Sequence, residues 1–206
     1  MPHRLAVAAW LIAAVALPLP AISGAMPVRL EAVVPLDAPD QALFAEAVLR
    51  SSNAARQAHG RPPLRLDPGL ARAASGHARN MARLRTHAHV LPVPGEATLG
   101  QRMRRQSLRF RLAGENIARD KALRLLGRPI SVAHAGCSFT YADTGTPVPR
   151  HSYASLAEQV VGRWLASPQH RASLLSPGFT RLGAGIAADP TAPACGDFYL
   201  VQTFAD

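Results

Sequence analysis

The hexapeptide Ala113-Gly114-Glu115-Asn116-Ile117-Ala118 is the most informative segment of this 206-residue sequence. Its Glu115 is the only carboxylate between Glu96 and Asp120, and it follows a run of arginines at Arg102, Arg104, Arg105, Arg109 and Arg111. Because Gly and Asn tolerate left-handed backbone angles, we expect a strand that enters a Gly-Glu-Asn turn and aims the Glu115 carboxylate into a cleft. The alternative is an ordinary turn in which Glu115 pairs with a nearby arginine.

The amino terminus has the layout of a secretory signal. Residues 1–4 include a basic residue, residues 5–19 are apolar, and Ser23 and Ala25 supply the small residues of a cleavage site. We therefore predict a signal peptide over residues 1–25, a leader segment over residues 26–38, and a secreted or periplasmic protein. An uncleaved anchor is the alternative, but the apolar run is short for a membrane span. No later segment is apolar and long enough to cross a bilayer.

Export determines how the two cysteines are interpreted. Two cysteines in an oxidising compartment usually pair, so a Cys137–Cys195 disulfide is expected. Neither cysteine belongs to a closely spaced C-x-x-C pair, which argues against a cysteine-based zinc site.

The formal net charge of +10 comes almost wholly from arginine, because Lys121 is the only lysine. Removing residues 1–25 would take away one arginine and leave +9. Such a charge favours anionic envelope components, including lipid head groups. Nucleic acid is not expected as a partner, because the sequence has no zinc finger, RNA-binding signature or helix with a concentrated basic face. The alternative is arginine used generally as a solvated surface residue.

Capping residues and apolar spacing predict three helices in the first half of the chain. One follows Asp40 and ends near Gly60, and a second follows Asp67-Pro68 with an apolar stripe that includes His77. A short basic helix is expected from Thr98 to Met103, and a strand from 108 to 113. His77 is interpreted as a hydrogen-bonded core histidine.

The second half has fewer local signals. Residues 120–153 are interpreted as an inserted loop with a short helix near 121–126. Ser155 and Glu158 form a predicted capping box that opens a helix, and Ser167-Pro168 begins another. Residues 182–188 and 198–204 alternate as an antiparallel hairpin. Helices combined with a small antiparallel sheet make a single α+β domain over residues 39–206.

Five segments, taken together, resemble the CAP superfamily (cysteine-rich secretory protein, antigen 5 and pathogenesis-related), and most closely its bacterial branch. They are residues 53–67, residues 78–89, Gly114-Glu115-Asn116-Ile117-Ala118, Trp164-Leu165-Ala166-Ser167-Pro168-Gln169-His170-Arg171, and residues 177–185. They occur in the family's order and cover most of the predicted domain. The resemblance implies a three-layer α-β-α sandwich with a central cleft.

By the same resemblance, His89, Glu115 and His170 face one another in the cleft, where some relatives hold a divalent metal. His89 is preferred to His87 because it lies eight residues after Met81. Asn116 and Arg171 are added as ligand-binding residues. Two imidazoles and one carboxylate suit Zn²⁺ with an open fourth position, so zinc or another divalent cation is a possible cofactor, although none is required.

The sequence also departs from the family pattern. Ser167 stands where many eukaryotic members have a second glutamate, and Ser173 stands where the His-Arg motif continues to asparagine. The resemblance then implies a secreted binding module for a lipid, sterol or envelope component. The alternative is a peptidase-like hydrolase that uses His89, Glu115 and His170, but no nucleophile can be identified. We expect binding rather than catalysis.

Overall fold

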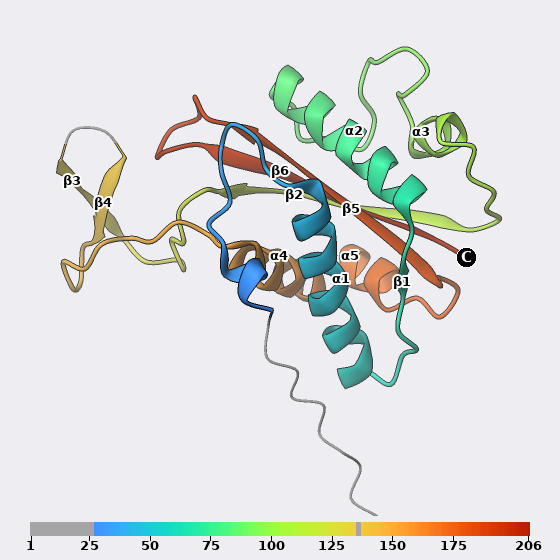
Figure 1. Cartoon of the computed structure of the whole chain (residues 1–206), viewed down its shortest axis with the longest axis horizontal. Helices are drawn as coiled ribbons and strands as arrows, with labels where there is room; N and C mark the ends of the chain where they lie inside the picture. Colours follow the sequence, from blue (N-terminus) through green and yellow to red (C-terminus); the bar gives the residue numbers. More distant parts are fainter. Residues whose placement is uncertain (1–26, 135–136) are drawn as a thin grey trace, which may run out of the picture.

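The computed structural model describes residues 27–134 and 137–206; the predicted signal peptide lies outside this part of the chain. A four-stranded sheet separates two layers of helices, with α2 and α3 on one face and α1, α4 and α5 on the other (Figure 1). The elements are η1 (Val28–Glu31), α1 (Gln41–Ala58), β1 (Arg65–Leu66), α2 (Pro68–Leu84), α3 (Leu99–Arg105), β2 (Ala113–Lys121), β3 (Ile130–His134), β4 (Ser138–Tyr141), α4 (Tyr153–Ala166), α5 (Pro168–Leu174), β5 (Arg181–Asp189) and β6 (Asp197–Ala205). The expected α-β-α sandwich is confirmed.

The sheet has the order β1-β5-β6-β2, which makes β2 an edge strand. β6 is antiparallel to both β5 and β2, and the predicted hairpin at the end of the chain is confirmed. The predicted strand over 108–113 is wrong, because β2 begins at Ala113 and pairs with β6 through Lys121. Glu115 and Asn116 therefore lie inside a strand and not in a turn. Position 114 has no room for a side chain, because a Cβ there would lie 2.8 Å from the Phe179 ring. This close contact accounts for the glycine.

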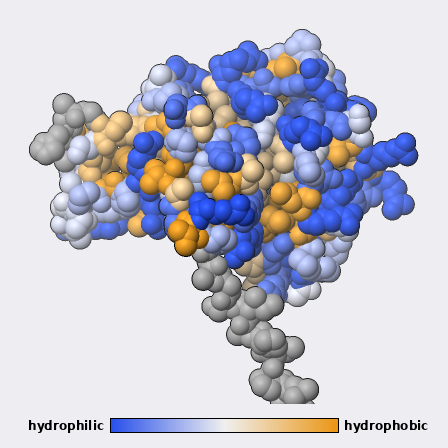
Figure 2. Space-filling view, in the orientation of Figure 1, coloured by the Kyte–Doolittle hydropathy of each residue, from blue (hydrophilic) through white to orange (hydrophobic). Residues whose placement is uncertain are grey.

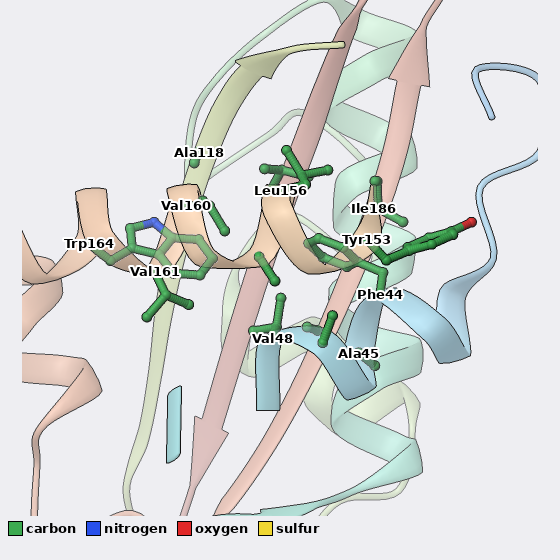
Figure 3. Close-up of a cluster of buried hydrophobic side chains, with 14 of the residues drawn as sticks. Phe44, Ala45, Val48, Ala118, Tyr153, Leu156, Val160, Val161, Trp164 and Ile186 are labelled. Carbon is green, nitrogen blue, oxygen red and sulfur yellow. The ribbon is translucent and has the colours of Figure 1, made fainter. Parts of the chain in front are cut away.

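The alternation of side chains along β6 builds the two sides of the core. Phe198, Leu200 and Phe204 pack with α1 and α4, whereas Tyr199 and Val201 pack with α2. The larger cluster joins apolar residues of α1, α4 and the sheet, and Figure 3 shows Phe44, Val48, Leu156 and Trp164 converging between the two helices and the strands.

Side-chain caps fix the starts of the helices. Asp40 and Asp67 accept hydrogen bonds from the first backbone amides of α1 and α2, and Thr98 forms a capping box with Gln101, as the predicted starts require. The predicted Ser155–Glu158 box is wrong. Ser152 caps α4 and Ser155 is its partner, so the helix begins at Tyr153. The helix predicted at Ser167-Pro168 is confirmed as α5.

The region from 120 to 153 contains a two-stranded sheet, β3–β4, which projects from one end of the molecule (Figure 1). The helix predicted near 121–126 is wrong, because β2 runs through Lys121 and the chain then turns. The expected disulfide is confirmed: Cys137, beside β4, is bonded to Cys195 in the β5–β6 connection. Arg128 stacks on the Tyr141 ring and also pairs with Asp143.

The predicted leader segment is packed against the domain in its described part. Leu30 of η1 and Val34 are buried in the larger core cluster, and Val34 N donates to the His151 carbonyl. Across residues 27–134 and 137–206, none of the helices combines the length and the hydropathy needed to cross a membrane.

Candidate functional site

Glu115 points from β2 toward the face of the sheet that α2 covers, and its side chain is only 3% exposed. Both of its carboxylate oxygens accept hydrogen bonds from Arg102 Nη2, at 2.9 and 2.7 Å. His89 Nδ1 lies 2.9 Å from Oε1. Burial by itself raises the pKa of a carboxyl group, but the His89 hydrogen bond and the Arg102 charge outweigh it and lower the pKa of Glu115. The carboxylate is therefore ionised and held on two sides.

Arg102 comes from α3, which the Thr98 cap starts at a fixed position. Its side chain is 2% exposed. While Nη2 binds Glu115, Nη1 donates to the carbonyls of His89, Glu96 and Ala97 at 3.2–3.3 Å. One guanidinium thus connects β2 to the loop between α2 and α3. The arginine partner of Glu115, which was the alternative interpretation of this segment, is present and is Arg102.

His77 lies on the buried face of α2 and is fully buried. Its Nε2 is 3.8 Å from Glu115 Oε1, and within the described chain neither ring nitrogen makes a hydrogen bond of normal geometry. Burial, with a further contribution from the Arg102 charge, lowers the pKa of His77 to about 4. The prediction of a core histidine is therefore confirmed as to burial, and a hydrogen-bonding contact with the Ala88 backbone opposes the lowering of its pKa.

Two of the other predicted residues, Asn116 and His170, are in contact with each other. Asn116 faces the opposite side of the sheet from Glu115 and is fully buried, and its Nδ2 donates to the His170 carbonyl and to Gln202 Oε1, both at 3.2 Å. Burial and the neighbouring His89 and Arg163 lower the pKa of His170. The structure thus brings His89 to the Glu115 carboxylate, and connects His170 to β2 through a backbone contact.

The predicted zinc ligands do not form a suitable donor set. No group of three or more His, Cys, Asp and Glu side chains able to hold a metal ion occurs among the residues that the structure describes. A cationic guanidinium also lies against both oxygens of Glu115, the one carboxylate of the predicted set. A divalent metal ion therefore does not fit the present arrangement of His89, Glu115 and His170.

Arg171 lines a different surface from the one that holds Glu115. A groove of about 800 Å³ lies between α1 and α4, and its lining includes Leu49, Val161 and Leu165. A second pocket of about 560 Å³ lies beside α5 and includes Arg171. The two share Arg61 and Leu165 in their linings and are therefore adjacent, and we call the pair the α1/α4 groove.

Sequence reasoning missed the roles of Arg102, His77 and Arg61. Arg102 had a signal, because it is one of five arginines near an isolated carboxylate, but the choice among the five depends on the position of α3. His77 had no signal besides its place on an apolar stripe. Arg61 lies in a Gly-Arg-Pro-Pro loop, and nothing local indicates that the loop returns to α4 and α5.

Comparisons with known proteins agree with this fold. The family described as "CAP: Cysteine-rich secretory protein family" matches residues 49–204. The uncharacterized protein YkwD of Bacillus subtilis is 26% identical over 142 residues, which are 69% of this chain and 42% of that protein. An extracellular protein containing an SCP domain from Bacillus anthracis aligns with a TM-score of 0.53 and 27% identity, over 79% of this chain and 40% of that one.

An outer surface protein from Borrelia burgdorferi has a TM-score of 0.52 and 18% identity, over 81% of this chain and 95% of that one, which supports the fold alone. The chain spans less than half the length of YkwD and of the Bacillus anthracis protein. Because the family match covers most of the described domain and every one of the motif segments lies within it, the chain belongs to the cysteine-rich secretory protein (CAP) family.

Proposed function

We propose that this protein is an exported binding module that holds the acyl chain of an anionic lipid in the α1/α4 groove. The observation that supports this proposal is the size and the lining of the groove. Its volume of about 800 Å³ lies within the range of small-molecule sites, and most of its exposed surface is apolar. The polar and charged residues that also line it are Arg50, Ser51, Asn53, Gln57, Arg61 and Glu158. Small residues, Ala54, Ala55 and Gly162, line it where the two helices face each other, which leaves room that larger side chains would fill.

Charge at one end of the groove favours an anionic head group. Arg61 lies where the two parts of the groove meet, and Arg171 lines the part beside α5. A guanidinium binds carboxylate and phosphate oxygens in a bidentate manner. Although Glu158 also lines the groove, its apolar surface together with Arg61 and Arg171 is complementary to a molecule with a hydrocarbon chain and an acidic end. Figure 2 shows patches of hydrophobic surface between hydrophilic ones on the face that carries α1.

An extracytoplasmic location fits the proposal. The amino-terminal residues have the pattern of a secretory signal, and disulfides such as Cys137–Cys195 persist in oxidising compartments. The similar proteins from Bacillus anthracis and Borrelia burgdorferi are described as extracellular and as an outer surface protein. An exported protein meets lipids and anionic envelope components directly.

No specific observation favours the hydrolase alternative. In the described residues, no Ser, Thr or Cys side chain is hydrogen-bonded to His89 or His170. Both oxygens of Glu115 already accept hydrogen bonds from Arg102. A carboxylate fixed in this way is poorly placed to take a proton from a substrate or water.

Filling the groove tests the proposal. Gly162 lines it, and a Cβ at this position would meet no atom within 4 Å, so Gly162→Phe should fold and occupy the space of the acyl chain. Each methylene excluded from an apolar site costs about 0.8 kcal/mol, so displacing two or three should weaken binding of a fluorescent long-chain fatty acid by about tenfold or more. Gly76→Phe is the matched control, because Gly76 is an equally open helical glycine on α2, away from the groove.

The role of Arg61 and Arg171 in binding the acidic head group can be tested separately. The double variant Arg61→Gln with Arg171→Gln should weaken binding of the fatty acid but leave binding of the corresponding fatty alcohol unchanged. The double variant Arg79→Gln with Arg83→Gln, on the exposed surface of α2, is the control for net charge because it removes the same two charges. Equal affinity of the wild type, Gly162→Phe and Gly76→Phe for the fatty acid would rule out the groove as its site.

A further inference from the structure

Arg102 has the contacts of a bound cation. Its side chain is almost fully buried. Five oxygens surround the guanidinium and accept its hydrogen bonds: the two carboxylate oxygens of Glu115 and the carbonyl oxygens of His89, Glu96 and Ala97. Carboxylate and carbonyl oxygens are the ligands that a hard metal ion would gather. Here a guanidinium gathers them, at distances between 2.7 and 3.3 Å.

The position of this charge prevents a second cation from approaching Glu115. A metal ion bound to the carboxylate would lie within a few ångströms of the Arg102 guanidinium, in a site from which water is largely excluded. Two like charges at such a distance repel strongly, because the surroundings screen them poorly. Arginine does not lose its proton to relieve this repulsion. A metal could enter only if the Arg102 side chain left, which would break its five hydrogen bonds.

We infer that Arg102 is an internal replacement for a metal ion: it neutralises Glu115, fixes the loop between α2 and α3, and excludes divalent cations from the Glu115 carboxylate. Two histidines beside Glu115 indicate which kind of metal ion Arg102 excludes. His77 Nε2, 3.8 Å from Glu115 Oε1, and His89 Nδ1, 2.9 Å from the same oxygen, would remain beside the carboxylate if the guanidinium were absent. In the present arrangement of the described residues these three side chains do not form a metal site, and they would have to close around an ion once the guanidinium was gone. Two imidazoles and one carboxylate are a zinc-binding combination.

Arg102 connects the loop between α2 and α3 to β2 through its own hydrogen bonds. A structural metal would connect the loop to β2 through its ligands, and Arg102 makes the same connection from α3 with protein atoms alone. The α1/α4 groove lies on the other side of the sheet, where Asn116 and not Glu115 points. Loss of lipid binding and a change in metal binding are therefore separable results.

Zinc titration after removal of bound metal by a chelator tests this inference. By calorimetry, the wild type should show no Zn²⁺ site that Glu115→Gln abolishes. Arg102→Ala should bind one Zn²⁺ at least tenfold more tightly than the wild type, and the addition of Glu115→Gln to this variant should abolish the gain. Arg104→Ala, which removes an exposed arginine from the same helix, should behave as the wild type does.

Thermal unfolding covers the case in which Arg102→Ala folds poorly. Zn²⁺ should raise the Tm of Arg102→Ala, or restore a folding transition that is otherwise lost, and should leave the Tm of the wild type unchanged. Two results would each overturn the inference. One is wild-type Zn²⁺ binding that depends on Glu115, and the other is an Arg102→Ala protein that neither binds Zn²⁺ nor is stabilised by it.

Discussion

Glu115 is a buried carboxylate, and its negative charge is balanced by a single arginine, Arg102. The Arg102–Glu115 pair has side chains only 2% and 3% exposed, so each charge has lost most of its hydration and relies on the other. Such a pair specifies one arrangement of β2, α3 and the preceding loop, but either partner alone would be costly to bury.

Glu115→Gln keeps the shape of the side chain and removes its charge, leaving Arg102 buried without a counter-ion. We expect a loss of about 3–5 kcal/mol in the free energy of unfolding, measured by denaturant titration. Glu96→Gln is the control, because Glu96 pairs with the exposed Arg105 and the Gln oxygen can still accept the hydrogen bond from Asn80 Nδ2. This change should cost less than about 1 kcal/mol. Equal stabilities of wild type and Glu115→Gln would contradict a structural role for this ion pair.

Two buried histidines make the fold sensitive to acid. Burial lowers the pKa of His77 and of His151 to about 4 in each case, from an ordinary value of 6.5. The folded state therefore binds fewer protons than the unfolded state between these values, and stability must fall as the pH drops from 6.5 to 4. Full charging would cost on the order of 3 kcal/mol for each histidine. The lowered pKa of Glu115 adds a further loss below its ordinary value of 4.5.

Denaturant unfolding at about pH 7 and about pH 4.5 measures this dependence. The wild type should be clearly less stable at the lower pH, and a variant carrying His77→Gln and His151→Gln should lose much less stability between the two. A wild type with the same free energy of unfolding at both values would show that these histidines are not buried in the neutral form.

At the scale of elements, the contact between α2 and β5 depends on glycine. A Cβ at Gly183 would lie 2.1 Å from the backbone nitrogen of Ala71, and one at Gly185 would lie 2.2 Å from that of Ser75. The helix therefore rests directly on the strand, which is how His77 comes to lie above the sheet and near Glu115.

Gly185→Ala should push α2 away from the sheet and cost at least about 2 kcal/mol of unfolding free energy. Gly162→Ala is its control. It places the same methyl group on α4, where no atom lies within 4 Å, and should stabilise the protein by up to about 1 kcal/mol through helix propensity. Similar Tm values for the two variants would contradict the close packing of α2 on β5.

These elements also indicate how far the sequence can predict the structure. The starts of α1, α2 and α3 were predictable because Asp40, Asp67 and Thr98 act on backbone amides within three residues. The start of β2 was not, since it depends on pairing with β6, which is more than 75 residues away along the chain at every paired position. Gly114 looks like a turn residue locally, but the distant Phe179 explains it.

The same distinction applies to the candidate site. Glu115 could be singled out because it is an isolated acid, and the resemblance supplied His89, which does contact it. The identity of its arginine partner and the proximity of His77 depend on how α2 and α3 pack on the sheet, so neither could be predicted from local sequence. Arg171 was predicted as a ligand residue, and its position in the same groove as Arg61 keeps that prediction open on a different surface.

For the whole molecule, the disulfide connects the projecting β3–β4 sheet to the β5–β6 connection. Cys137 and Cys195 are 58 residues apart, and closing a loop of that length destabilises the unfolded chain by about 4 kcal/mol at most. A reductant should therefore lower the Tm of the wild type, and should leave the Tm of the Cys137→Ser, Cys195→Ser variant unchanged. Two free thiols in the denatured, unreduced mature protein would contradict the bond.

The central claim is that the α1/α4 groove binds an anionic lipid. NMR tests it most directly, by following the amide chemical shifts while a short-chain phosphatidylglycerol is added below its critical micelle concentration. If the α1/α4 groove holds the lipid, the saturable shifts should concentrate on Ala54, Gly162 and Leu165, and extend to Arg61 and Arg171 at the charged end. Shifts that concentrate instead on His89, Glu115 and His170, or the absence of any saturable shift, would contradict the account.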